Sequence, residues 1–237
     1  HLLLPISPRA TYTPAQLSAL SERAEIEQFW YVPREYLDAF GESAVAAYFE
    51  ISEQPLLEEY LYYTEDLARL KGNRYAGKRN WINRLTRNYA GRFRIEPIEP
   101  PDVQECLCFL EDWCREFACA PEQTESFYCE KQATINALKG MHALGLEGIL
   151  IRIDGAVQAF GISSGLTGEI GVLSFEKARA AVKGLYQLLD NECAKRLFRS
   201  YRYINKESDM GLPGLAQSKQ SYHPIEKIAS YCLKRKN

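Results

Sequence analysis

Apolar and polar residues follow two patterns along the chain, a helical period and the two-residue alternation typical of strands. A helix is predicted from Pro14 to Glu25, where Thr13 can cap the first turn and proline takes the first helical position. From Asn73 to Tyr89 the apolar residues also fall on roughly one helical face. The other elements expected in this part are strands at 1–6, 28–32, 60–63 and 92–98, a helix at 33–41, and either state at 44–51.

Prolines at positions 97, 100 and 101 interrupt this pattern and give the best domain boundary. We therefore expect one domain at residues 1–98 and a second at residues 99–237. In the second domain Asp154-Gly155 has the composition of a two-residue hairpin turn. The elements predicted there are helices at 101–117, 125–144, 184–198 and 212–221, and strands at 148–153, 156–163, 169–175, 201–205 and 225–233.

The order of these elements predicts the α+β class, with the mixed sheet of an acetyltransferase-type (GNAT) fold. Many α+β domains share this order, so a function has to be argued from particular residues. The bulk composition is that of a soluble globular protein, with 46% hydrophobic and 25% charged residues. No apolar run approaches the roughly 20 residues of a membrane helix, so no transmembrane segment is expected.

The seven cysteines are odd in number, contain no CxxC pair and are accompanied by three scattered histidines. We interpret them as reduced thiols rather than as a metal site, and we expect no metal. With no leader sequence in evidence, the expected location is the cytoplasm. The chain opens on His1 with a strand already under way, so we expect upstream residues to be missing.

The strongest chemical signal is a basic segment from Arg69 to Arg94, which holds nine Lys or Arg residues and no Asp or Glu. The whole chain is slightly acidic, so this charge is concentrated, and tyrosines and a tryptophan lie between the charges. One interpretation is a phosphate clamp, and the absence of compensating Glu residues favours it. The alternatives are a solvated helix face or a surface that packs against a partner subunit or the other domain. The predicted phosphate ligands are Lys71, Arg74, Lys78, Arg79 and Asn80.

A second anion site is predicted where the strand ending in Glu176-Lys177 leads through a short loop into a helix that Gly184 opens. Backbone N–H groups at a helix N-terminus attract anions. The usual acetyltransferase signature is absent there, and a plain strand-to-helix connection is the alternative. The residues assigned to this site are Lys177, Lys183, Gly184 and Tyr186.

A third cluster of polar residues follows the short strand at 201–205. Glu207 or Asp209 could deprotonate an amine nucleophile, and Tyr222 could protonate a leaving group, with Asn205 and Lys219 nearby in the sequence. The residues alone favour the alternative, a hydrogen-bonded turn followed by a capped helix. No serine lies in a nucleophile elbow, and no cysteine has a suitable histidine partner in the sequence.

Three motifs together resemble a known family: Lys71-Gly72 with Lys78-Arg79-Asn80, Phe175-Glu176-Lys177-Ala178, and Ile204-Asn205-Lys206-Glu207 through Tyr222. From about Tyr60 onward the chain resembles bacterial proteins related to the C-terminal catalytic domain of phosphatidylglycerol lysyltransferase. The resemblance implies two tandem GNAT-like domains, the first N-terminally incomplete. It also implies kinship with enzymes that move an aminoacyl group from charged tRNA to a lipid headgroup. The membrane flippase portion has no counterpart, and Ala216 and Gln217 replace the Arg and Lys that relatives often carry.

We therefore expect an acyl- or aminoacyltransferase with acyl-CoA or aminoacyl-tRNA as the anionic donor and no covalently bound cofactor. The acceptor would be an amine, a hydroxyl group or a phospholipid. The expected base is Glu176 or Glu207, and the expected acid is Tyr222. The alternative is a non-catalytic protein that binds RNA or an anionic metabolite in a degenerate GNAT pocket. The sequence leaves the oligomeric state open.

Overall fold

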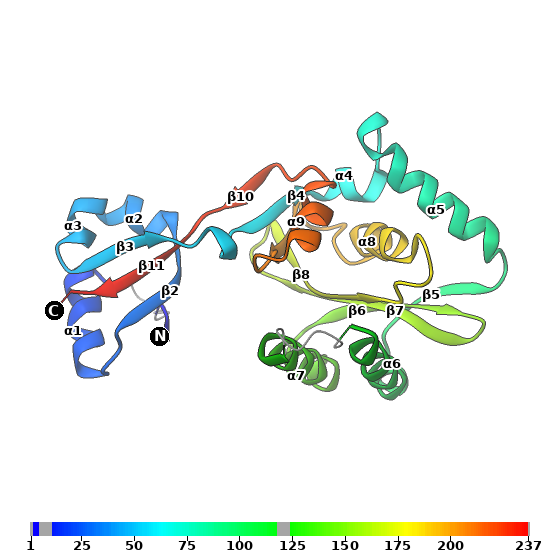
Figure 1. Ribbon diagram of the computed structural model, residues 1–237, viewed down its shortest axis with the longest axis horizontal. Coiled ribbons are helices and arrows are strands. Elements are labelled where there is room, and N and C mark those ends of the chain that lie inside the picture. The colour runs from blue at the N-terminus through cyan, green and yellow to red at the C-terminus, as the bar shows by residue number, and fades with distance from the viewer. Residues whose placement is uncertain (1, 5–10, 118–123, 237) are drawn as a thin grey trace. The chain divides into compact units, whose positions relative to one another are not determined.

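The computed structural model describes residues 2–4, 11–117 and 124–236. Its chain divides into two units (Figure 1): unit 1 comprises residues 1–61 and 207–237, and unit 2 comprises residues 62–206. This division differs from the boundary expected near residue 98. The strand that ends at the first of the three boundary prolines, β5 (Phe93–Pro97), pairs with β6 (Glu147–Ile153) inside unit 2. The chain passes between the units in β4 (Glu59–Tyr63) and β9 (Tyr203–Ser208).

Unit 1 contains a four-stranded sheet in which the C-terminal strand lies between β2 and β3. The order is β1 (Leu2–Leu3), β2 (Gln28–Pro33), β11 (Ser230–Arg235) and β3 (Phe49–Glu53). The hydrophobic core of this unit includes Leu17, Phe29 and Phe49, which are almost completely buried. Its helices are α1 (Pro14–Arg23), α2 (Arg34–Phe40), α3 (Glu42–Ala46), the 3₁₀ turn η1 (Pro55–Leu57) and α9 (Pro213–Gln220).

Two expectations for unit 1 need correction or completion. The single strand predicted at 225–233 is two strands, because β10 (Glu226–Ile228) pairs with β4 whereas β11 pairs with β2 and β3. The chain therefore changes partners at Ala229. The segment 44–51 contains both predicted states, the end of α3 and the start of β3. Of the strand predicted at 1–6, His1 and residues 5–6 lie outside the described residues.

The sheet of unit 2 runs in the order β9, β8, β7, β6, β5, with β7 at Ala156–Gly165 and β8 at Ile170–Ala178. Neighbours from β5 to β8 are antiparallel, whereas β8 and β9 are parallel and are joined through α8 (Leu185–Arg196). Asp154 and Gly155 both have positive φ, at 53° and 86°, as the predicted hairpin turn requires. The mixed sheet confirms the predicted α+β class.

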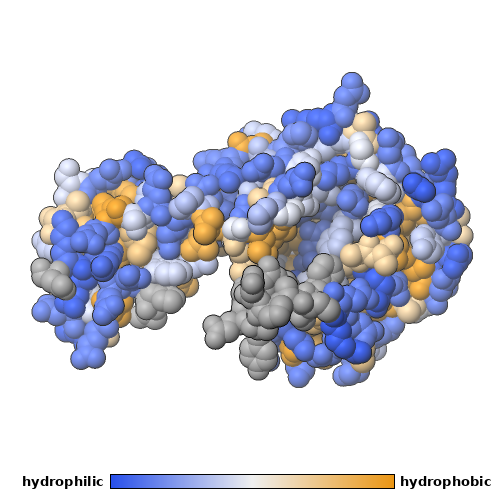
Figure 2. Space-filling model, viewed as in Figure 1, coloured by the Kyte–Doolittle hydropathy of each residue, from blue (hydrophilic) through white to orange (hydrophobic). Residues whose placement is uncertain are grey.

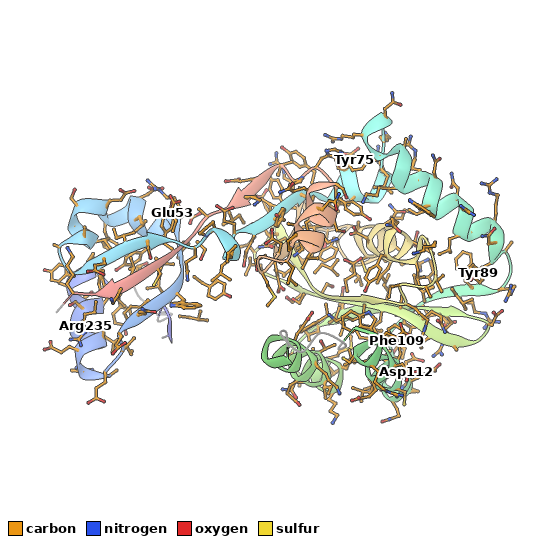
Figure 3. All side chains as sticks on the ribbon, in the orientation of Figure 1. Glu53, Tyr75, Tyr89, Phe109, Asp112 and Arg235 are labelled. Atoms are coloured by element: carbon orange, nitrogen blue, oxygen red, sulfur yellow. The ribbon has the colours of Figure 1, made fainter. Side chains whose placement is uncertain are left out.

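Helices cover both faces of this sheet (Figure 1): α6 (Val103–Phe117) and α7 (Thr124–Gly140) on one face, α8 on the other. Apolar side chains pack between α6, α7 and the first face. For example, the ring of Phe109 (labelled in Figure 3) meets that of Phe160 edge to face, with 5.9 Å between the ring centroids. Further helices pack on α8, namely α4 (Thr64–Arg69) and α5 (Ala76–Asn88), which follows the 3₁₀ turn η2 (Asn73–Tyr75). Tyr75 and Tyr89 mark the two ends of α5 in Figure 3.

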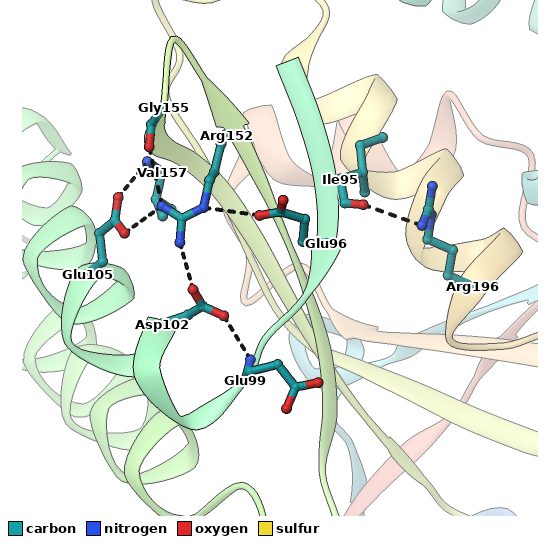
Figure 4. Close-up of polar contacts among 9 residues, drawn as sticks. All are labelled: Ile95, Glu96, Glu99, Asp102, Glu105, Arg152, Gly155, Val157 and Arg196. Carbon is teal, nitrogen blue, oxygen red and sulfur yellow. Dashed lines mark hydrogen bonds and ion pairs between the residues drawn. The ribbon is translucent and has the colours of Figure 1, made fainter. Parts of the chain in front are cut away.

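The proline-rich stretch is fixed in unit 2 by Arg152 of β6 (Figure 4). Its guanidinium pairs with Glu96 at 3.1 Å, with Asp102 of the 3₁₀ turn η3 (Pro100–Asp102) at 2.7 Å, and with Glu105 at 2.5 Å. The hydrogen bond from Arg152 is the main reason why the pKa of Glu105 is lowered. These bonds join β5, η3 and α6, so residues 97–101 are an integral part of the unit and not a linker between domains.

Five cysteines are described, and all of them are free thiols: Cys106, Cys108, Cys114, Cys193 and Cys232. Burial raises the pKa of Cys106 to about 12 and the pKa of Cys193 well above its usual range, which makes these two thiols unreactive. Cys119 and the side chain of Cys129 lie outside the described part of the chain. Within that part, no helix has both the length and the apolar character needed to cross a bilayer.

Candidate functional site

A cluster of charged side chains is buried in unit 2. The Nζ atom of Lys206 in β9 lies 2.9 Å from Oδ2 of Asp190 on α8 and 3.1 Å from Oε2 of Glu176 on β8. The exposed fractions of these side chains are 9% for Lys206, 3% for Asp190 and 18% for Glu176. Lys78 of α5 interacts electrostatically with all three. We call these four residues the ion cluster.

The topology of unit 2 explains why these residues meet. The parallel register of β8 and β9 runs from Ile170 and Tyr203 to Val172 and Asn205. Lys206 follows the last of these pairs directly, and Glu176 lies farther along β8. The connection between two parallel strands passes over the sheet, and here that connection contains α8 and Asp190. The helix and the two strands therefore bring their charged groups to one place.

Lys206 remains protonated despite its burial. Burial on its own lowers the pKa of this lysine, but the charges of Asp190 and then Glu176 outweigh that effect, so the pKa is raised. The hydrogen-bonding capacity of the Asp190 carboxylate is not fully used, because no described residue donates a hydrogen bond to its buried Oδ1 atom. An unpaired buried acceptor is costly, and a ligand that brings an N–H group to this oxygen would remove that cost.

Lys78 gives the ion cluster a group that can exchange a proton. The side chain is half-buried, and its pKa is lowered chiefly by this burial, with a smaller contribution from the charge of Lys206; Asp190 and Glu176 act in the opposite direction. The neutral amine therefore forms at a lower pH than in an ordinary lysine. The sequence places Lys78 among the basic residues of α5, but the structure places it beside the carboxylates of Asp190 and Glu176.

The other predicted phosphate ligands of the basic segment have different environments. Arg79 donates hydrogen bonds to the carbonyl oxygens of Leu70 and, at 2.7 Å, Gly72, and so fixes the turn after α4. Arg74 pairs with Asp66 at 2.7 Å. Lys71 and Asn80 are exposed, and hydrophilic residues predominate on the surface over α5 (Figure 2). Of the five predicted ligands, the structure thus brings Lys78 to the ion cluster.

Lys177 lies on the opposite face of β8 from Glu176, because successive residues of a strand point to opposite sides. Its ammonium is buried, pairs with Glu130 of α7 and lies 4.4 Å from the centre of the Trp113 ring. The hydroxyl group of Tyr186 accepts a hydrogen bond from Nε1 of Trp113 at 3.1 Å. Burial raises the pKa of Tyr186 to about 12, so this phenol stays protonated.

Gly184 is the N-cap of α8 and has a φ of +94°. A Cβ atom at this position would lie 2.6 Å from the carbonyl oxygen of Trp81, so the glycine permits the close approach of the α5 backbone. Lys183, the preceding residue, is exposed. An anion at the Gly184 amide remains a prediction.

The third predicted cluster belongs mostly to unit 1. Lys219 of α9 donates hydrogen bonds to the carbonyl oxygens of Glu207 at 3.1 Å and Ser208 at 2.5 Å. The hydroxyl group of Tyr60 donates to Asp209 Oδ2 at 2.5 Å. These contacts form the hydrogen-bonded turn that was the alternative interpretation. Glu207 is exposed, Tyr222 is buried, and Asn205 is buried in β9 of unit 2.

Sequence reasoning assigned no role to Asp190 and Lys206, the two most buried members of the ion cluster. One signal was present in the sequence: about one helical turn from Asp190 lie Tyr186, Cys193 and Ala194, so the carboxylate shares its helix face with apolar residues. A charge on such a face requires a buried partner. The partner, Lys206, lies sixteen residues farther along the chain on another element, and only the fold identifies it.

Comparisons with known proteins agree with this fold. A family model described as phosphatidylglycerol lysyltransferase, C-terminal, matches residues 3–234. A conserved protein of unknown function from Bacteroides thetaiotaomicron is 31% identical, with a TM-score of 0.84 over 93% of this chain and 76% of its own length. The search of curated proteins found no match.

Two further solved structures share the fold at low identity. The C-terminal DUF2156 domain of a protein from Agrobacterium fabrum is 14% identical, with a TM-score of 0.68 over 100% of this chain and 77% of its own. L-PGS from Bacillus licheniformis is 13% identical, with a TM-score of 0.64 over 94% of this chain and 72% of its own.

Proposed function

Because the chain belongs to the family of phosphatidylglycerol lysyltransferase C-terminal domains, we propose that it is an aminoacyltransferase that reacts at the ion cluster of unit 2. The observation that carries this proposal is the buried Oδ1 atom of Asp190, which has no hydrogen-bond donor among the described residues. The donor would be an aminoacyl ester of tRNA, and its amino group would bind to this oxygen.

The charges of the ion cluster favour an aminoacyl group over a simple acyl group. When Lys78 is the neutral amine that the reaction requires, Asp190 and Glu176 share the ammonium of Lys206, so the four side chains of the ion cluster carry one excess negative charge. An amino group brings a positive charge and N–H donors, which neutralise that excess and satisfy Oδ1. An acetyl or fatty acyl group brings neither.

The reaction would be direct transfer. A hydroxyl or amine of the acceptor attacks the ester carbonyl carbon of the donor, the new bond forms at that carbon, and the ester C–O bond breaks. Lys78, as the neutral amine, takes the proton of the attacking group and returns it to the departing ribose oxygen. Glu176 and Asp190 hold the amino group in place, which positions the carbonyl for attack. In keeping with the family, the first acceptor to test is the hydroxyl group of phosphatidylglycerol.

A comparison of two donors tests this proposal. One donor is tRNA charged with a radiolabelled amino acid, the other is acetyl-CoA, and the acceptor is phosphatidylglycerol in vesicles. We expect transfer from the charged tRNA, and we expect Asp190→Asn to lower kcat/KM by about tenfold to 100-fold, the value of one charge-assisted hydrogen bond. The matched control is Asp112→Asn, which alters an exposed carboxylate of α6 (Figure 3) and should leave the rate unchanged.

The melting temperature of each variant separates an effect on the reaction from a loss of folding, and Glu176→Gln serves as a second variant of the ion cluster. Transfer from acetyl-CoA alone, or equal rates for Asp190→Asn and the wild type, would contradict the proposal. Donor binding without turnover would instead support a non-catalytic binding protein.

A further inference from the structure

A separate open pocket lies in unit 2 and shares no lining residue with the ion cluster. Its volume is about 720 Å³, which lies within the usual range for small-molecule sites. It is lined by α4, the C-terminal end of α8 and the turn before β9. Two acidic side chains line it, Glu65 and Asp66, beside five basic ones: Arg69, Lys71, Lys195, Arg199 and Arg202.

The positive charge of this pocket is only partly neutralised. Glu65 pairs with Arg69 at 2.9 Å, and Asp66 pairs with Arg74, which lies outside the lining, at 2.7 Å. Among the described residues no carboxylate forms an ion pair with Lys71, Arg199 or Arg202, so the charges of these three side chains are not neutralised by an acidic residue. A concave surface with such an excess of cations attracts anions.

One residue that lines the pocket, Thr64, has a buried hydroxyl group without a hydrogen-bond partner in the described part of the chain. Thr64 is 7% exposed, and no described residue forms a hydrogen bond with its Oγ1 atom. The backbone N–H of Thr64 is already bonded to the carbonyl oxygen of Arg202 at 3.0 Å, so the hydroxyl group is the part of this residue left to interact. A phosphate oxygen would accept a hydrogen bond from it and remove the cost of its burial.

An aromatic wall adjoins these cations. The ring of Tyr63 is 41% exposed, lines the pocket and stacks on Tyr203 at a centroid distance of 5.5 Å and an interplanar angle of 30°. The guanidinium of Arg202 lies 5.1 Å from the centre of the Tyr203 ring. An exposed ring beside cations that no carboxylate neutralises is the combination on which nucleotide bases stack while their phosphates are neutralised.

We propose that this pocket binds a nucleotide, with its phosphate at Lys71, Arg199 and the Thr64 hydroxyl group and its base against Tyr63. The nucleotide could be free or could belong to a single-stranded segment of RNA, since both present the same phosphate and base. The proposal goes beyond the transfer reaction, because none of its residues belongs to the ion cluster.

Fluorescence anisotropy of the full chain with a short labelled oligouridylate, and with AMP as a competitor, tests this proposal. We expect Lys71→Glu to weaken binding at least about tenfold and to lower the salt dependence by about one released ion. Lys139→Glu, which makes the same change on an exposed lysine of α7, should not alter binding. Thr64→Val should weaken binding several-fold without lowering the melting temperature, because the hydroxyl group has no protein partner to lose.

Competition identifies the source of the nucleotide. Displacement of the oligonucleotide by AMP supports a free nucleotide, whereas binding that AMP does not displace but Lys71→Glu abolishes supports a strand of RNA. Absence of binding by both probes would overturn the proposal, as would equal losses in Lys71→Glu and Lys139→Glu. The assay requires no transfer, so its outcome is independent of the proposed reaction.

Discussion

Replacing Lys206 by methionine is expected to lower the free energy of unfolding by about 3–5 kcal/mol, the cost of removing one partner from a buried ion pair. The variant would leave Asp190 and Glu176 without the ammonium that lies 2.9 and 3.1 Å from them. Urea unfolding followed by circular dichroism measures this change. Because the pKa of Lys206 is raised, its contribution is fully present below the unfolded lysine pKa and is lost only as pH rises through the folded value.

The matched comparison is a triple variant that adds Glu176→Gln and Asp190→Asn to Lys206→Met. It removes the uncompensated charges together with the lysine, and we expect it to recover most of the lost stability. A loss of less than about 1 kcal/mol in Lys206→Met alone would show that the two carboxylates do not depend on this lysine.

Replacing Lys78 by arginine is expected to lower kcat for aminoacyl transfer by about 100-fold or more, the usual contribution of a general base. Arginine keeps the positive charge but does not release its proton in the working pH range. In the wild type, kcat should rise with pH and level off above the lowered pKa of Lys78, because the neutral amine is the active form. Steady-state rates over a range of pH measure both effects, and the Arg variant should lose this rise.

Two further variants separate proton transfer from a general loss of structure. Lys78→Ala should regain part of its activity when a small primary amine is added, because the free amine can take the position of the side chain. Lys139→Arg makes the same chemical change on an exposed lysine of α7 and should leave kcat and its pH dependence unchanged. An unchanged pH profile in Lys78→Arg would rule out Lys78 as the base.

Local features of the fold could be predicted from the sequence because they depend on neighbouring residues. Thr13 caps α1 as predicted, and Asp154-Gly155 forms the predicted hairpin turn. The domain boundary expected near residue 98 differs from the observed division, because the expectation used only the prolines near that position. Prolines mark a break in an element, but the pairing of β5 with β6 and the bonds of Arg152 join the segments on either side.

The candidate site could be predicted in part for the same reason. Glu176 and Lys78 were identified by residue type. The same reasoning also selected the neighbouring Lys177 as a ligand, but this residue lies on the opposite face of β8. Asp190 and Lys206 are members of the candidate site because they form an ion pair with each other. A buried charge on one element is informative only when the element that carries its partner is known.

The most direct test of the account compares a charged tRNA with the same tRNA after acetylation of the amino acid's α-amino group. If that amino group binds to Asp190, acetylation removes its charge and should lower kcat/KM of the wild type by about tenfold or more. Acetylation should then have little effect in Asp190→Asn. Equal rates with the two donors in the wild type would contradict the assignment of the ion cluster as the aminoacyl site.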